Sequence, residues 1–236
     1  MFRRLVVSVL VGVTIAGVAP TSSASAAIGP GDALIQPGGA VENPNNSTSI
    51  KFVCPLGFIL QRTSGTSAQR AKRYTTLSLH CGGSVGTRVK APAPDIGYFG
   101  TIVFQTSSNT SLVEIDSDKL HKVSPVLKGY GAAPSGIASQ AQIKIGDVVV
   151  TYTYPLTWPG TGVGHEDAVT WVNDPRYPYF GTATPDLAHG NPFVNKSNGL
   201  AYGLSDQTLL LNGANSLHYV LDQIANGTGF SLTLAL

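Results

Sequence analysis

The residues best placed to do chemistry are a histidine and the two cysteines of the chain. His80 directly precedes Cys81 in the segment LSLHCGG, and Cys54 opens the segment CPLGFIL. Histidine is the side chain best suited to take up and return a proton near neutral pH, so His80 is a candidate general base. A general base also needs a nucleophile to activate and a third group to orient it, and both must come from elsewhere in the chain.

The N-terminal segment predicts export. Residues 1–27 carry two arginines, then an apolar run from Leu5 to Val18, then a cluster of small residues, which is the order of a secretory signal peptide. The apolar run is too short to cross a bilayer comfortably, and no later stretch reads as a membrane helix. We therefore expect cleavage near Ala26 or Ala27 and a secreted, extracellular mature chain without a membrane span.

Export predicts that Cys54 and Cys81 form a disulfide, because the extracellular compartment is oxidising and the two cysteines allow a single pairing. Closing the loop would stabilise the fold by about 3–4 kcal/mol on the chain-entropy model. Two unpaired buried thiols are the alternative.

Charge is scarce, at 12% of the residues, and the formal net charge is +2. The basic residues that cluster lie between Gln61 and Tyr74, in a Ser/Thr/Gly-rich stretch that we interpret as a solvated hairpin tip. A nucleic-acid surface would need a denser basic stripe interleaved with aromatic residues, so we expect no nucleic-acid partner.

Frequent glycines and prolines divide the chain into short segments, several of which alternate apolar and polar residues as β-strands do. A helix is predicted near the C-terminus, because Leu217, Val220, Leu221 and Ile224 share one helical face. Asn215 or Ser216 would cap this helix and Gly227 would stop it. The candidate strands are Ile50–Leu60, Arg73–Leu79, Tyr98–Gln105, Ser111–Ile115, Gln142–Tyr154, Gly199–Leu204 and Phe230–Leu236.

Taken in order, these segments resemble the secreted actinobacterial branch of the chymotrypsin-like (trypsin-type) serine proteases, over roughly residues 52–236. CPLGFIL is similar to the C-x-x-G-F strand of that family, and LSLHC stands where the family has TAGHC. SLVEID resembles D-x-A-L-V-E-I-D, and IKIGDVVVTYTY resembles G-D-x-V-x-x-Y-G-Y. HGNPFVNKSNGLAYGL is similar to S-G-G-P-x-x-x-x-x-G-x-A-x-G-L, the segment that holds the nucleophile.

The resemblance implies an all-β fold, in which two six-stranded antiparallel β-barrels flank the active-site cleft and a short helix lies near the C-terminus. We expect a signal peptide at residues 1–27 and an irregular N-terminal lead-in at residues 28–49. The protease-type domain would occupy residues 50–236, with barrels at approximately 50–125 and 126–236. No cofactor is expected.

The resemblance also places the catalytic positions of the family. His80 falls on the retained base, Asn109 on the aspartate and His189 on the serine, because Pro192 aligns with the proline of G-D-S-G-G-P. Asparagine cannot supply the charge that stabilises an imidazolium, a replacement that costs about 10⁴ in turnover in a chymotrypsin-type enzyme. An imidazole cannot replace the alkoxide without forming a labile acyl-imidazole.

Leu187 falls on the glycine of the oxyanion turn, and Ala188 replaces the aspartate of the same motif. A leucine disfavours the backbone conformation that would aim an amide into an oxyanion hole. The preferred interpretation is therefore a catalytically inactive protease homologue, a pseudoenzyme, that binds an extracellular peptide or protein ligand.

Two other interpretations stay open. An active secreted serine endopeptidase could use a displaced nucleophile, Ser197 or Ser205, although neither lies in a glycine-flanked turn. Alternatively, the chain is an extracellular metal-binding protein or an unrelated β-sandwich. If the alignment holds, His80 and His189 face each other and suggest a metal site with Asn109 or a carboxylate nearby, but zinc usually needs three or four protein ligands.

Overall fold

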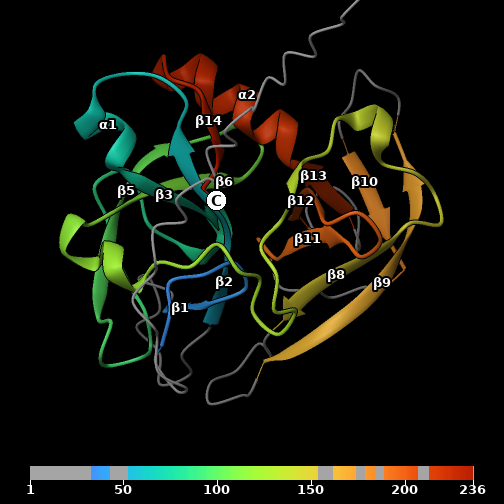
Figure 1. Ribbon diagram of the computed structural model, residues 1–236, viewed down its shortest axis with the longest axis horizontal. Coiled ribbons are helices and arrows are strands. Elements are labelled where there is room, and N and C mark those ends of the chain that lie inside the picture. The colour runs from blue at the N-terminus through green and yellow to red at the C-terminus, as the bar shows by residue number, and fades with distance from the viewer. Residues whose placement is uncertain are drawn as a thin grey trace, which may run out of the picture. The chain divides into compact units, whose positions relative to one another are not determined.

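The computed structural model describes residues 33–42, 53–153, 162–173, 179–183, 189–206 and 213–235. Within these residues the chain folds into two β-barrels and a C-terminal helix (Figure 1). This confirms the predicted all-β fold of two six-stranded antiparallel β-barrels with a short C-terminal helix. The predicted signal peptide lies outside the described residues.

The first barrel is built from six antiparallel strands, in the order β1-β2-β3-β6-β5-β4 among the described residues. Glu42 of β1 and Lys90 of β4 form an ion pair of 3.1 Å, which links the two strands at the ends of that order. A further strand, β14, pairs with β2. The bounds are β1 Ala40–Glu42, β2 Val53–Arg62, β3 Arg73–Ser78, β4 Arg88–Lys90, β5 Tyr98–Gln105, β6 Thr110–Ile115 and β14 Leu232–Leu234.

The second barrel is a closed ring in the described residues, because β11 pairs with both β8 and β12. The order around the ring is β11-β8-β9-β10-β13-β12, and the short β7 adds a parallel pairing to β12. The bounds are β7 Gly136–Ile137, β8 Val148–Thr153, β9 Val163–Val172, β10 Tyr179–Thr182, β11 Pro192–Asn195, β12 Leu200–Ser205 and β13 Gly213–Ser216.

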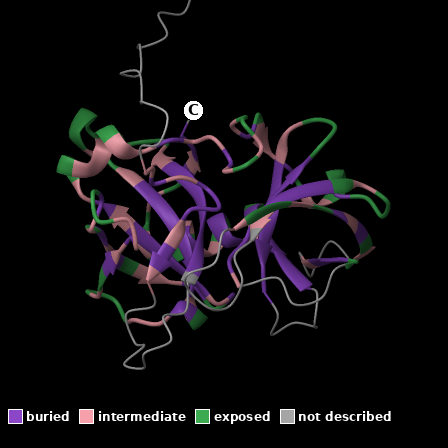
Figure 2. Ribbon diagram, turned by 90° about the horizontal axis from the view of Figure 1, so that it is seen from below, coloured by how far each residue is buried: buried purple, intermediate pink, exposed green. Residues whose placement is uncertain are grey.

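Each barrel encloses its own apolar core. Leu56, Leu77 and Ile102 are fully buried in the first barrel, and Phe180 and Phe193 meet edge-on inside the second, with ring centroids 5.8 Å apart. The strands of both barrels are accordingly coloured as buried along much of their length, whereas exposed residues gather in the helices and connecting loops (Figure 2). Strict alternation of buried and exposed side chains does not describe all of these strands, because β11 and β13 are buried at every position.

The helix α2 spans Leu217–Thr228 and buries the predicted apolar stripe against residues of both barrels. Gly227 does not stop it, contrary to the sequence prediction. The helix ends instead at Gly229, whose φ of 74° lies in the left-handed region that favours glycine at a helix C-terminus. Gly227 faces the ring of Phe104, with which a Cβ at this position would collide.

Two further sequence interpretations are corrected by the structure. The basic stretch that we interpreted as a hairpin tip contains a short helix, α1 (Ser67–Ala71), because Thr66 and Gln69 form a capping box. Within the predicted irregular lead-in, Ala40–Glu42 forms β1, because its backbone pairs with β2 and Val41 is fully buried. Three 3₁₀ helices complete the described elements: η1 (Leu79–Cys81), η2 (Ser117–Lys122) and η3 (Gln140–Gln142).

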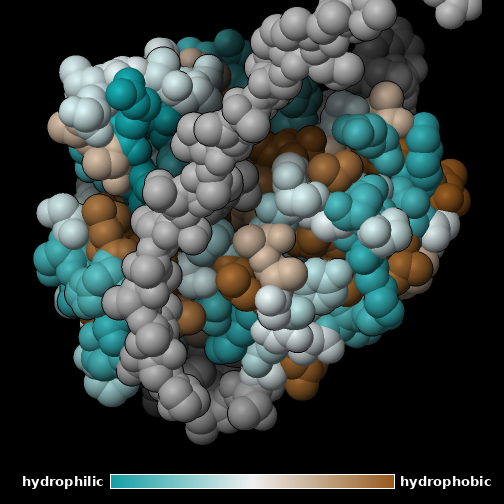
Figure 3. All heavy atoms as spheres, in the orientation of Figure 1, coloured by the Kyte–Doolittle hydropathy of each residue, from teal (hydrophilic) through white to brown (hydrophobic). Residues whose placement is uncertain are grey.

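The surface is mixed in polarity. On the coloured part of the face in Figure 3, hydrophobic residues appear in several separate places among polar ones. No helix among the described residues is long and apolar enough to cross a membrane.

Candidate functional site

His80 lies in η1, at the end of β3, where several local contacts fix its backbone. Its N–H donates to the hydroxyl of Ser78 at 3.2 Å, and the neighbouring Cys81 forms the predicted disulfide with Cys54, with their Cα atoms 5.9 Å apart. The N–H of Leu79 donates to the carbonyl of Asn109 at 2.7 Å. The side chain of His80 is exposed. The backbone of this histidine is thus held in place while its imidazole is exposed to solvent.

His189 comes from the second barrel, in the turn that precedes β11. Gly190 follows it with a φ of 88°, and the backbone here approaches β3 so closely that a Cβ on Gly190 would lie 3.1 Å from the nitrogen of Ser78. This close approach brings the rings of His80 and His189 together, with centroids 4.4 Å apart and planes tilted by 33°. The side chain of His189 is 26% exposed.

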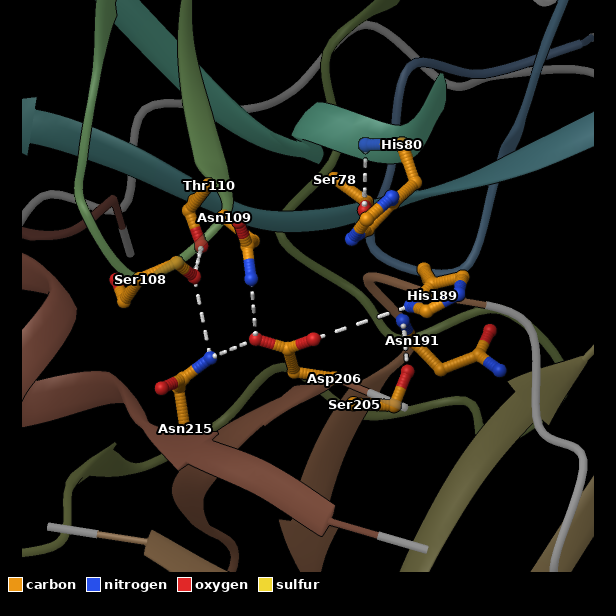
Figure 4. Close-up of polar contacts among 10 residues, drawn as sticks. All are labelled: Ser78, His80, Ser108, Asn109, Thr110, His189, Asn191, Ser205, Asp206 and Asn215. Carbon is orange, nitrogen blue, oxygen red and sulfur yellow. Dashed lines mark hydrogen bonds and ion pairs between the residues drawn. The ribbon is translucent and has the colours of Figure 1, made fainter. Parts of the chain in front are cut away.

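A third residue, Asp206, completes the cluster, and the sequence analysis missed it. Asp206 directly follows β12 and is buried. Its Oδ1 lies 4.0 Å from Nδ1 of His189. Its Oδ2 accepts hydrogen bonds from the side-chain amides of Asn109 at 3.2 Å and Asn215 at 2.9 Å (Figure 4). The one sequence signal that could have found it is its place two residues after the predicted strand Gly199–Leu204.

Asn109 reaches Asp206 from the first barrel because of its unusual backbone. Its φ of 56° makes it the one non-glycine residue with positive φ in the described part of the chain, and asparagine tolerates this region better than most residues. The preceding turn is held by its own hydroxyls, since Thr106 Oγ1 and Ser108 Oγ lie 2.9 Å apart. The amide of Asn215 also donates to the carbonyl of Ser108 at 3.1 Å. The hydrogen bonds from Asn109 to Asp206 and from Asn215 to Ser108 join the two barrels at the site.

The electrostatics favour a neutral His189. Burial lowers the pKa of the His189 imidazole below its ordinary value, the adjacent His80 lowers it further, and the carboxylate of Asp206 partly opposes both effects. At neutral pH, therefore, His189 presents an unprotonated ring with one nitrogen able to accept a hydrogen bond or to coordinate a cation.

The two serines considered as displaced nucleophiles make hydrogen bonds within the second barrel. The hydroxyl of Ser205 accepts from the backbone N–H of Asn191 at 2.8 Å. The hydroxyl of Ser197 donates to Oδ1 of Asn195 at 2.7 Å. These bonds organise the turns around β11 and β12. The expected oxyanion position, Leu187, and its neighbour Ala188 lie outside the described residues.

The fold is the chymotrypsin-like double β-barrel of serine proteases. No protein-family model matches the sequence, and no curated protein matches it either. Among solved structures, the chain is similar to an α-lytic protease homologue, N4, with a TM-score of 0.50 and 17% identity over 85% of this chain and 99% of that one. It is also similar to the VesB protease of Vibrio cholerae, with a TM-score of 0.51 and 15% identity over 80% of this chain and 63% of VesB.

Proposed function

We propose that this protein is a secreted homologue of the chymotrypsin-like serine proteases that has lost peptidase chemistry and acts by binding an extracellular peptide or protein. One observation carries the proposal: the ring of His189 faces the imidazole of His80 with 4.4 Å between centroids. In a working site of this fold, a serine hydroxyl would take that place.

Acyl transfer requires a nucleophile within about 2.6–3.2 Å of the general base and an orienting group behind that base. Here the imidazole at the general-base position, His80, faces a second imidazole, that of His189. An imidazole is a weak nucleophile for a peptide bond. The orienting position holds Asn109, whose amide is used to donate a hydrogen bond to Asp206. The carboxylate of Asp206 lies beside His189 and accepts hydrogen bonds from Asn109 and Asn215. This arrangement does not reproduce a Ser-His pair whose histidine is stabilised by the charge of an aspartate.

Secretion is part of the proposal. The order of residues at the N-terminus supports it. The disulfide between Cys54 and Cys81 is consistent with an oxidising compartment. Binding is supported by the exposure of His80 and the partial exposure of His189, which leave the site open to solvent between the two barrels.

The test uses mature protein purified without a tag, incubated with casein and with a fluorophosphonate probe that labels activated serines. We expect neither cleavage nor labelling above the level of a heat-denatured sample, while an active trypsin-type protease assayed in parallel gives both. Inhibitor-sensitive labelling that disappears in His80→Ala and in either Ser197→Ala or Ser205→Ala would refute the proposal and establish the displaced-nucleophile endopeptidase instead.

A further inference from the structure

Three side chains with metal-binding atoms converge from three separate segments of the fold. They are His80 from η1, His189 from the turn before β11 and Asp206 from the end of β12 (Figure 4). One ligand atom of each lies within 4.8 Å of the other two. We propose that these three residues form a binding site for a divalent transition metal ion, for which Zn²⁺ is the best match.

The chemistry of the ligands selects this class of ion. Two imidazole nitrogens and one carboxylate oxygen are a ligand set that suits zinc and related first-row metals, whereas calcium and magnesium prefer sites made of oxygen atoms. A tetrahedral zinc ion with bonds of about 2.0 Å places its ligand atoms roughly 3.3 Å apart. Nδ1 of His189 and Oδ1 of Asp206 are 4.0 Å apart, so the site must contract slightly on binding.

The contraction is available because the three ligands differ in freedom. Asp206 is buried and fixed, and His189 is partly buried beside it. Closing the 4.0 Å gap therefore needs a small movement of the His189 ring, which is 26% exposed, toward Asp206. The exposed side chain of His80 can follow this movement without losing core packing. The same exposure leaves a coordination position open to solvent, where a water molecule or a donor group of a bound ligand would complete the coordination.

The surroundings of Asp206 match those of a metal-binding carboxylate. One oxygen, Oδ2, accepts from Asn109 and from Asn215, while the other, Oδ1, points toward His189. Hydrogen bonds of this kind orient metal ligands, and their removal typically weakens metal binding by about 10- to 100-fold. Asn109, at the position of the aspartate in the protease family, thereby becomes a positioning residue for Asp206.

The inference goes beyond the proposed function, since a site of this kind does not require the loss of peptidase chemistry. The alternative is that the two imidazoles stack beside a hydrogen-bonded carboxylate and bind no ion. The protein offers a matched control for the distinction. His218 and Asp222 form a second histidine-carboxylate pair at 3.4 Å, on the exposed face of α2, in which both side chains are more than half exposed.

The experiment is a calorimetric titration of untagged, chelator-treated protein with Zn²⁺. We expect one zinc ion per chain with a micromolar or tighter dissociation constant. His80→Ala and His189→Ala should each weaken binding by at least about 100-fold, since these residues supply the ligand atoms, and Asn109→Gly by about 10-fold. His218→Ala should leave the affinity unchanged. A visible absorption band of tetrahedral Co²⁺, lost in His80→Ala, would support the same three ligands.

His80→Ala keeps the test decisive, because His80 is exposed and its removal leaves the core intact, as circular dichroism and the melting temperature can verify. Absence of zinc binding by the wild-type protein would overturn the proposal. So would binding that persists unchanged in folded His80→Ala, or binding that His218→Ala abolishes. The serine-probe assay reads a different property, so a failure here leaves the proposed loss of peptidase activity to be judged by its own result.

Discussion

The side-chain amide of Asn109 donates a 3.2 Å hydrogen bond to the carboxylate of Asp206, across 97 positions of sequence and from one barrel to the other. Because of this bond, the residue that occupies the expected aspartate position supports a carboxylate that the second barrel supplies. The carboxylate of Asp206 lies beside His189, with Oδ1 4.0 Å from Nδ1 of that ring.

We predict that replacing Asn109 separates its backbone role from its side-chain role. Asn109→Gly keeps the positive φ but removes the amide that binds Asp206, and should lower the free energy of unfolding by about 1–3 kcal/mol. Asn109→Ala should cost about 1–2 kcal/mol more, because alanine is strained at a φ of 56°. Denaturant unfolding measures both. Equal stability of Asn109→Gly and wild type would contradict the role of the amide.

A second prediction concerns the disulfide. Cys54→Ser combined with Cys81→Ser should lower the free energy of unfolding by about 3–4 kcal/mol, because the unfolded chain regains the freedom of the closed loop. Thermal melting of the double variant is the measurement, and wild-type protein melted under reducing conditions should match it. An unchanged melting temperature in both samples would rule out a stabilising role for the bond that anchors the His80 segment.

A third prediction concerns the dependence of stability on pH. The folded-state pKa of His189 is lowered by burial, so below the ordinary value of 6.5 the unfolded chain binds more protons than the folded chain. The contribution of His189 to stability is therefore fully present above that value and decreases as the pH falls through it. When the pH is lowered from about 7.5 to about 5 in chelator-containing buffer, the free energy of unfolding should fall less for His189→Gln than for the wild type.

The control for this comparison is His218→Gln, which removes an exposed histidine and should retain the pH dependence of the wild type. Urea unfolding at the two pH values gives the difference. A slope in His189→Gln as steep as that of the wild type would show that the decrease comes from other groups.

A fourth prediction tests the packing of β12, which ends just before Asp206, against β13, which contains Asn215. Gly203 in β12 lies so close to the backbone carbonyl of Asn215 that a Cβ would collide with it, and the ring of Phe180 lies within 2.8 Å of the same point. Gly203→Ala should therefore destabilise the protein by about 2 kcal/mol or more. Gly164→Ala on β9 is the control, because its Cβ would meet its nearest neighbour at 3.9 Å. Similar melting temperatures for the two variants would contradict this packing.

Much of the fold could be predicted because strands are local patterns. The bounds expected for Tyr98–Gln105 are those of β5, and the apolar stripe of α2 follows from residues four positions apart or fewer. Of the features that escaped prediction, α1 depends on its own capping box, whereas two others depend on partners far away in the chain. Ala40–Glu42 is a strand because β2 lies beside it. The helix α2 continues through Gly227, against which the ring of Phe104 packs, and ends at the left-handed Gly229.

The sequence by itself determined the pairing of Cys54 with Cys81, since only one pairing is possible, and the local patterns of most strands and of the C-terminal helix. The order of its motifs carried the resemblance that implied the two-barrel fold and the positions of His80, Asn109 and His189. Only the tertiary structure decided that Asp206 joins them. The pairing of β12 with β13 places Asp206 beside Asn215, and contact between the barrels brings Asn109 to the same carboxylate. A side chain becomes part of a site when folding sets its distance from others, and no spacing along the chain encodes that distance.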